Sequence, residues 1–429
     1  MRSDRQLAAI VAAIAFLALA PGAFFGIPAG GTVVGATRVL SGELPYRDFH
    51  APCAPGTLYL EALLFGLLGR SLAVQALALA VLRAGSSAAL LLLLRRAGVA
   101  RGVVSASAAV LALSAFGTGL ELAPHEPALL LILLAFHGVL PRRLLRAGLW
   151  LGAAAIFEHR LAACAVLGAS IALLSSRRSP LRLLAGALLV VLPAAAILAR
   201  AAGRATWLDL AALPSAELAR TATAGLALLS AVLFGLAWPR SRVPGRAALA
   251  AAGAILALFL LASPARAAKR MLASLPGSRL LGFPGAALAL VPAEEHLLYR
   301  RVVSFVRANV PEGEPIYVGA ARHDASAVSA PCLYFLCDRP PCTRFHELDP
   351  RIIAREDVQT EIACAIDALS VRCLVLVRSP GAAKRDQDVR ESPRAGSRFL
   401  DDWIAEHFDT ALEAGPYRIL WLRPAAESR

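Results

Sequence analysis

The chain has 429 residues, 58% of them hydrophobic, with a mean hydropathy of +0.62 and a formal net charge of +14. This composition is too apolar for an ordinary water-soluble domain and predicts an integral membrane protein. Residues 1–264 contain 22 Lys and Arg against 9 Asp and Glu, whereas residues 265–429 contain 22 against 21. Because the basic excess lies in the apolar part, nucleic acid is excluded as the expected partner.

Apolar segments in residues 1–264 have about the length of membrane helices. A helix needs about 20 residues to cross about 30 Å of hydrocarbon. The segments predict a polytopic α-helical membrane bundle of about nine spans, with residues 56–69 as a further interfacial or half-inserted helix. The nine predicted spans are 7–26, 72–94, 102–118, 124–140, 146–158, 161–175, 181–201, 222–238 and 247–263.

Arginines gather in alternate loops between these segments, as in the loop of Arg95, Arg96 and Arg101. The positive-inside bias makes these loops cytoplasmic. With nine spans the C-terminal part is then extracytoplasmic, which predicts a multi-pass protein of a bacterial-type inner (cytoplasmic) membrane. The first segment is read as an uncleaved anchor because its apolar run continues to Ile27, and a cleaved signal peptide is the alternative.

Acidic residues of the apolar part lie on the other side. The positive-inside bias concerns Lys and Arg and does not require this, so the acids indicate a site at the extracytoplasmic face. All but Asp4 belong to this group: Glu43, Asp48, Glu61, Glu121, Glu126, Glu158, Asp209 and Glu217.

Residues 265–429 are predicted to form an extracytoplasmic α/β domain. An amphipathic helix is expected at 293–310, strands at 315–320 and 372–377, and further helices at 354–369 and near 397–408. The segments "ALEAG" and "YRILWLR" close the domain, and residues 380–397 are polar enough for a mobile loop.

Cysteines are concentrated in this domain, which contains five of the seven. Cys332, Cys337 and Cys342 recur at intervals of five, which is not a zinc-site spacing. In an oxidising compartment the spacing predicts at least one disulfide partner among them.

A polar, turn-rich loop interrupts the apolar part. It contains "GELPYRDF" (42–49) and leads into "PGTLYLEALLFGLLG" (55–69). Together with the predicted spans, these segments resemble the C-type glycosyltransferase superfamily, in the branch of aminoarabinose transferases, protein mannosyltransferases and lipopolysaccharide-core transferases. The resemblance covers about residues 7–175 well and the remainder in general layout.

The resemblance implies transfer of a sugar from a polyprenyl-phosphate-linked donor to a glycan, lipid or protein acceptor at the extracytoplasmic face. A carboxylate accepts or steers the proton of the attacking group, and cations neutralise the departing phosphate. A divalent cation is optional for such a site. The implied residues are Asp48 and Glu126 as catalytic carboxylates, Arg47 and Arg160 at the donor phosphate, and Glu43, His50, Glu121, His125, Glu158 and His159 in support of the acceptor or the loop.

One departure from the family pattern bears on the reaction. Family members often have an Asp-Glu pair about twenty residues before the Asp of this loop, where Pro28 and Ala29 stand here. Either Asp48 or Glu43 replaces it, or the chain keeps the scaffold as a non-catalytic membrane protein that binds lipid-linked glycan or a partner. An ion pair between Arg47 and Asp48 that only stabilises the loop is also compatible with the sequence.

Overall fold

A computed structural model describes 26–96, 122–139, 143–175, 177–203, 275–324, 330–348, 350–378 and 396–424, with a few single residues before Gly26. The chain divides into two compact units, each made of separate segments. The helical unit comprises Met1–Phe25, Cys53–Leu68 and Val74–Pro276. The sheet unit comprises Gly26–Pro52, Gly69–Ala73 and Gly277–Arg429. The loop segment 26–52 thus belongs to the same unit as the C-terminal domain, and the expected boundary at 264/265 lies outside the described residues.

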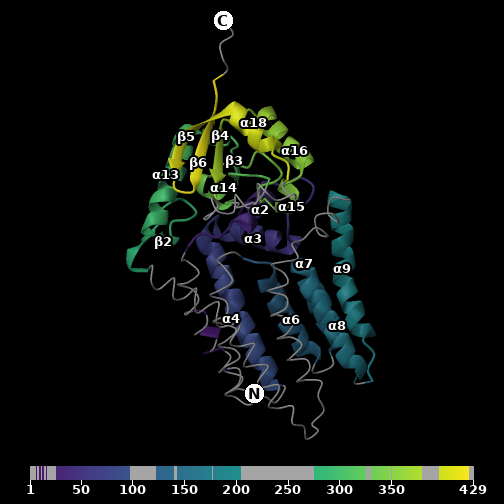
Figure 1. The fold of residues 1–429 in the computed structure, drawn as a ribbon. Coiled ribbons are helices and arrows are strands. Elements are labelled where there is room, and N and C mark those ends of the chain that lie inside the picture. Colours follow the sequence, from purple (N-terminus) through teal and green to yellow (C-terminus); the bar gives the residue numbers. More distant parts are fainter. Residues whose placement is uncertain are drawn as a thin grey trace, which may run out of the picture. The chain divides into compact units, whose positions relative to one another are not determined.

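The helical unit is built from apolar helices that pack on one another (Figure 1). Alanines such as Ala128, Ala147 and Ala154 are fully buried where helices meet. In the described residues its helices are α3 (Pro55–Leu68), α4 (Leu72–Arg96), α6 (His125–Val139), α7 (Leu144–Phe157), α8 (His159–Ser175) and α9 (Leu181–Ala202).

The prediction of a bundle with about nine spans is wrong for the part of the chain that the structure describes. Only α4 and α9 are long and apolar enough there to cross a membrane, and most of α4 is buried inside the protein. Helices α6, α7 and α8 have 15, 14 and 17 residues, fewer than the about 20 that a span needs. The candidates 7–26, 102–118, 222–238 and 247–263 fall largely or wholly outside the described residues.

The localisation that was inferred from those spans is wrong for the same reason. A multi-pass inner-membrane protein with an exported C-terminal domain needs a chain of spans that alternates the loops between two sides. With two candidate spans in the described residues, the count that placed the C-terminal domain outside no longer holds. The apolar composition is instead partly used in contacts between helices, such as those around Ile132 and Leu151.

The sheet unit contains the predicted C-terminal α/β domain. Its four-stranded sheet has the order β3-β4-β6-β5, in which β3 and β4 are parallel and the other neighbours antiparallel. The strands are β3 (Tyr317–Ala320), β4 (Cys373–Val377), β5 (Phe408–Ala414) and β6 (Tyr417–Leu422), with a small pair β1 (Ser278–Leu280) and β2 (Leu290–Pro292) beside a short 3-10 turn (Leu275–Gly277).

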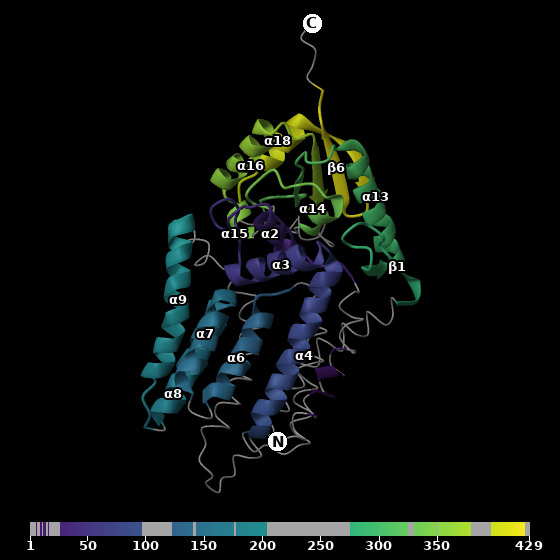
Figure 2. The same cartoon turned by 180° about the vertical axis from the view of Figure 1, so that it is seen from behind.

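Helices cover both faces of this sheet (Figures 1 and 2). On one face α13 brings Tyr299 against Tyr417 and Phe305 against Trp421, with ring centroids 5.8 and 6.4 Å apart. On the other face α16 and α18 pack on Leu374, Leu376 and Leu420. The helices of the unit are α2 (Gly31–Leu40), α13 (Ala293–Asn309), α14 (Cys332–Cys337), α15 (Pro350–Ile353), α16 (Glu356–Ala368) and α18 (Phe399–His407).

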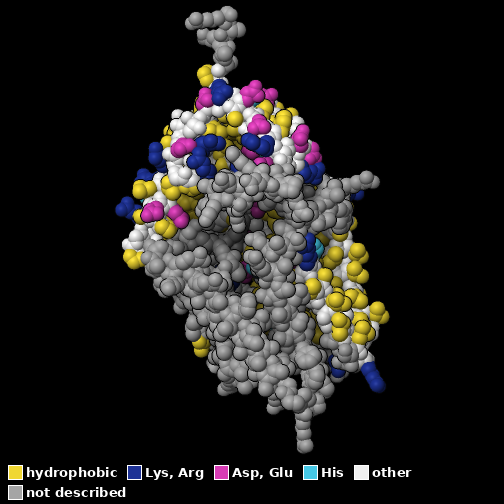
Figure 3. Space-filling view, viewed as in Figure 1, with side chains coloured by type: hydrophobic (Ala, Val, Ile, Leu, Met, Phe, Trp, Pro, Cys, Tyr) yellow, Lys and Arg dark blue, Asp and Glu magenta, His cyan; other side chains and the backbone are white. Residues whose placement is uncertain are grey.

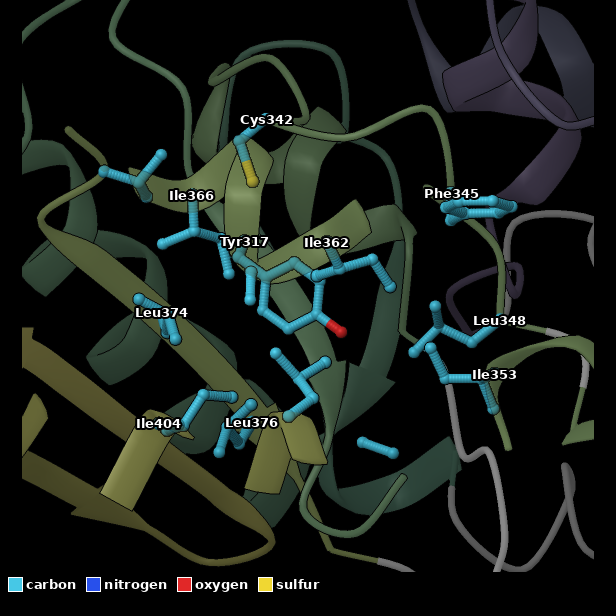
Figure 4. Packing of buried hydrophobic residues seen from close by; sticks show 14 of the residues in the cluster. Tyr317, Cys342, Phe345, Leu348, Ile353, Ile362, Ile366, Leu374, Leu376 and Ile404 are labelled. Carbon is cyan, nitrogen blue, oxygen red and sulfur yellow. The ribbon is translucent and has the colours of Figure 1, made fainter. Parts of the chain in front are cut away.

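The main core of the sheet unit surrounds Tyr317, whose side chain is fully buried (Figure 4). The ring lies over Gly319, where a Cβ would come 2.7 Å from the Tyr317 hydroxyl, so only glycine leaves room for it. His323 bridges the core to α18, since its ring bonds to the Tyr317 hydroxyl at 2.9 Å and to the Asp401 carboxylate at 2.7 Å. The expected strands and helices of this domain are confirmed, whereas the loop expected at 380–397 lies almost entirely outside the described residues.

The cysteines of the sheet unit form no disulfide. Cys332, Cys337 and Cys342 are buried and none of them is disulfide-bonded, which contradicts the predicted disulfide partner. Cys332 and Cys337 lie at the two ends of α14, and burial raises the pKa of the Cys337 and Cys342 thiols to about 12. They therefore act as small apolar core residues.

Helix α2 connects the loop segment 26–52 to the rest of the sheet unit. It begins after Gly30 and ends in a Schellman motif, in which Glu43 N–H donates to Arg38 O at 3.0 Å and Gly42 N–H to Val39 O at 3.0 Å. At the other end, the Cys332 N–H donates to the Ala29 carbonyl at 3.1 Å.

Gly30 and Gly42 offer a matched test of this packing. Both have positive φ angles, 94° and 90°, but a Cβ on Gly30 would lie 2.5 Å from the Cα of Cys332, while nothing lies within 4 Å of one on Gly42. Gly42→Ala should cost about 1–2 kcal/mol through the backbone alone. Gly30→Ala should cost about 3 kcal/mol or more, because it also forces the segment off α14. Urea unfolding of the full chain, followed by Trp fluorescence, measures the difference, and equal costs would show that Gly30 does not pack against α14.

Candidate functional site

The "PYRDF" turn is fixed by more contacts than an ordinary surface turn has. Tyr46 is fully buried and has a left-handed φ of 68°. Its N–H donates to Phe49 O at 2.8 Å, and the Asp48 N–H donates to Leu44 O at 2.9 Å. A non-glycine residue in this conformation costs about 1–3 kcal/mol and persists only where its surroundings impose it.

The turn presents an ion pair at its surface. Arg47 Nε and Nη2 donate to the two carboxylate oxygens of Asp48 at 2.8 and 2.7 Å, and the Leu44 N–H donates to Asp48 Oδ2 at 2.8 Å. The Arg47 guanidinium, followed by the Leu44 N–H, lowers the pKa of Asp48 to about 2. Asp48 therefore stays ionised throughout the neutral range, which makes it a weak proton acceptor but a permanent negative charge.

The side chain of Arg38 supports the turn through hydrogen bonds. The side chain is buried, and its Nε and Nη2 donate to one Glu43 oxygen at 2.8 and 2.6 Å. Its Nη1 donates to Thr343 O at 2.9 Å and its Nη2 to Asp48 O at 3.3 Å. The guanidinium also lies 4.8 Å from the centre of the Phe49 ring. Arg38 thus joins the turn to a segment 305 residues later, and Glu43 is the counter-charge of this residue.

Two buried histidines complete the contact between the turn and the C-terminal domain. His50 N–H donates to Arg344 O at 2.9 Å. The His346 ring packs edge-on against Phe49, with centroids 5.4 Å apart, and its Nε2 bonds to Gly31 O at 3.2 Å. Burial, and secondarily the positive charge of Arg38, lowers the pKa of His346 to about 3. His346 is therefore neutral in the folded protein.

The second predicted carboxylate lies in the helical unit. Glu126, in the first turn of α6, accepts a hydrogen bond from Nε of Arg83 on α4 at 2.9 Å, and Arg83 Nη2 lies 2.9 Å from the same oxygen. Both side chains are buried, and His125 Nε2 lies 3.8 Å from the same carboxylate oxygen. A buried pair of this kind is expensive to break, because either partner alone would be an uncompensated buried charge.

Residues 158–160 form the junction between α7 and α8. A side-chain oxygen of Glu158 accepts the Arg160 N–H at 3.3 Å, so that Glu158 caps the start of α8, and His159 is the first residue of that helix. The sequence-predicted residues are thus distributed between two units: Glu43, Arg47, Asp48 and His50 in the sheet unit, and His125, Glu126, Glu158, His159 and Arg160 in the helical unit. Glu121 lies outside the described residues.

The optional divalent cation stays a prediction. Within the described ranges, no three His, Cys, Asp or Glu side chains gather closely enough to hold a metal ion. The carboxylates of Asp48, Glu43 and Glu126 are each bonded to an arginine instead.

Sequence reasoning missed the residues that hold the turn. Arg38 had a weak signal in the sequence, because Ser41-Gly42-Glu43 follows it and is typical of a helix end. Such a helix end can bring the Glu43 carboxylate back to the Arg38 side chain. Thr343 and His346 had none, because their contacts join segments about 300 residues apart.

Comparison with known proteins adds no relative. No protein-family model matches the chain, and a search of curated proteins found no match. The resemblance to C-type glycosyltransferases therefore stays a prediction from the loop and its neighbouring segments.

Protonation of His346 should destabilise the sheet unit. In the unfolded chain this group titrates near 6.5 and in the folded chain near 3, so the unfolded state binds the extra proton between these values. Stability is then complete above about pH 6.5 and is lost, by about 1.4 kcal/mol per pH unit, as the pH falls toward 3. His346→Gln should remove this dependence, whereas His407→Gln, at the end of α18, should retain it.

The effect is measured by amide hydrogen exchange of the full chain at residues 343–348. The exchange rate of each variant is divided by the wild-type rate at the same pH. Identical pH profiles for wild type and His346→Gln would contradict a buried neutral His346.

Proposed function

We propose that the chain transfers a sugar from a polyprenyl-phosphate-linked donor to an acceptor, with the Arg47–Asp48 turn at the reacting phosphate. The observation that carries the proposal is the construction of the turn. A buried Tyr46 in a costly backbone conformation, held by Arg38, displays an ionised Arg47–Asp48 pair at the surface. Imposed strain of this kind is concentrated at functional sites.

Arg47 is suited to the donor phosphate. In the described structure its guanidinium uses two of its five N–H groups on Asp48, which leaves N–H donors for the phosphate oxygens. About half of its side chain is exposed. Arginine recognises phosphate through paired N–H donors, and a cation here offsets the charge of the departing polyprenyl phosphate.

The reaction forms a bond from an acceptor oxygen or nitrogen to the anomeric carbon. The bond from that carbon to the phosphate oxygen breaks, and its electron pair leaves with the phosphate. Because the pKa of Asp48 is about 2, this carboxylate gains little as a base. It instead orients the acceptor N–H or O–H and offsets the positive charge that develops on the anomeric carbon. The acceptor's proton passes to the phosphate or to water.

The non-catalytic alternative has one specific observation in its favour. Each predicted carboxylate with a described pairing is already engaged by an arginine: Glu43 by Arg38, Asp48 by Arg47 and Glu126 by Arg83. A chain of this kind would bind a phosphate-linked glycan without releasing the lipid phosphate.

Transfer is tested with the full chain in detergent micelles and a polyprenyl-phosphate-linked sugar, by measuring release of polyprenyl phosphate. Arg47→Gln should lower the rate by about 10²–10³, as expected for loss of a donor to a transition-state charge. Asp48→Asn should lower it by about 10² and preserve the Leu44 hydrogen bond.

The matched controls are Arg355→Gln and Asp357→Asn. This pair has the same two-bond geometry, at 3.0 and 2.5 Å, on the surface of the same unit. Both control variants should turn over at the wild-type rate. Equal rates for all four variants would remove the turn from the mechanism, and binding of the donor without any release in wild type would establish the non-catalytic alternative.

A further inference from the structure

Helix α9 has an uninterrupted apolar outer surface. From residue 183 to residue 199 it contains no polar side chain, and of its large residues only Leu183 is buried. Leu188, Leu189, Leu192 and Ile197 are each half or more exposed. The space-filling view shows hydrophobic side chains gathered over α8 and α9, with basic side chains at one end (Figure 3). On α8, Leu167, Ile171 and Leu174 are exposed as well.

The inner face of α9 has the opposite composition. It packs on α7 mainly through small residues, including Gly148 and Gly152 of α7 and Gly186 and Ala187 of α9, with Leu183 as its one large buried residue. A Cβ on Gly152 would lie 2.6 Å from the Ala187 carbonyl oxygen, and one on Gly186 would lie 3.0 Å from the Gly148 Cα. The two backbones therefore approach too closely for larger side chains.

This arrangement is inverted relative to a helix pair in water. There, burial of large apolar side chains drives association, and the outer face is polar. Close contact through glycines spaced by four, with leucines outside, is instead typical of helices surrounded by hydrocarbon. There a leucine side chain gains no hydrophobic free energy by moving from lipid into a contact between helices.

The ends of α9 match the thickness of a bilayer. Arg182 and Arg200 bracket the apolar stretch, and the 18 helical steps from one to the other rise about 27 Å, close to the about 30 Å of a hydrocarbon core. Arg177, Arg178 and Arg182 are exposed at the start of the helix. The charge of Arg182 opposes the dipole of α9, whereas Arg177 and Arg178 follow the C-terminus of α8, where positive charge is favourable. Together the three charges suit anionic lipid headgroups.

We propose that α9, with the adjoining apolar face of α8, contacts the hydrocarbon of a lipid bilayer, and that Arg177, Arg178 and Arg182 bind the phosphates of one leaflet. The proposal concerns this single face and does not restore the nine-span arrangement. It is independent of sugar transfer, because neither α9 nor α8 contains a residue of the Arg47–Asp48 turn.

The test is flotation of the full chain with vesicles of phosphatidylcholine and phosphatidylglycerol. Leu192→Arg places a charge near the middle of the apolar stretch and should reduce partition into vesicles by on the order of 100-fold. Leu297→Arg is the matched control, because Leu192 in the middle of α9 and Leu297 in the second turn of α13 are 60% and 63% exposed. The control should float like wild type.

A second variant separates lipid from protein as the occupant. Leu192→Phe keeps the surface apolar but changes its shape, so it should float normally and would weaken a specific protein contact. Wild-type chain should also stay with the vesicles in concentrated salt, since the contact is mainly apolar.

Three results would overturn the proposal. The first is equal flotation of Leu192→Arg and Leu297→Arg. The second is release of wild type from vesicles by salt. The third is a wild-type chain that stays in solution as a stable dimer and does not float, because a second copy would then cover the α9 face.

Discussion

A buried arginine determines how the sheet unit is assembled. Removing a guanidinium from water costs several kcal/mol, and the cost is recovered only when its N–H groups are hydrogen-bonded and its charge is paired. Arg38 pairs with Glu43, donates to the carbonyls of Thr343 and Asp48, and lies over the face of Phe49. Because Thr343 is 305 residues away, this side chain joins the loop segment 26–52 to the C-terminal domain, together with the backbone hydrogen bonds Cys332–Ala29 and His50–Arg344.

Several properties of the turn follow from this contact. Arg38 holds the Asp48 carbonyl two residues after the left-handed Tyr46, and the Asp48 carboxylate adds its own bond from the Leu44 N–H. Burial, and secondarily the same positive charge, lowers the pKa of the neighbouring His346 and keeps it neutral. An ionised pair with a firm backbone is what recognition of a phosphate needs, whether or not a sugar is then transferred.

Local elements such as strands, helices and turns could be predicted from the sequence, whereas contacts between distant residues could not. The strands at 317–320 and 373–377 and the helix at 293–309 follow from periodicity, and the turn prolines marked a loop. The number of spans was wrong because a continuous apolar run looks the same whether it faces lipid or other helices, and α6, α7 and α8 are too short to cross. The partner of Asp48 is its neighbour Arg47, and the partner of Glu43 had a weak signal five residues away. The partner of Glu126 could not be predicted, since Arg83 is 43 residues away and no pattern pairs them.

Replacement of Arg38 by lysine tests the central claim most directly, because lysine keeps the charge but cannot make the forked contacts of a guanidinium. Hydrogen exchange at the Tyr46 and Asp48 amides of the full chain is the measurement, with Arg339→Lys as the control. Arg339 is equally buried in the same unit and donates to Val310 O, away from the turn. Loss of charged hydrogen bonds worth about 1.5–3 kcal/mol each predicts exchange at least about 10-fold faster in Arg38→Lys and unchanged at these amides in Arg339→Lys. Exchange at the wild-type rate in Arg38→Lys would contradict the account.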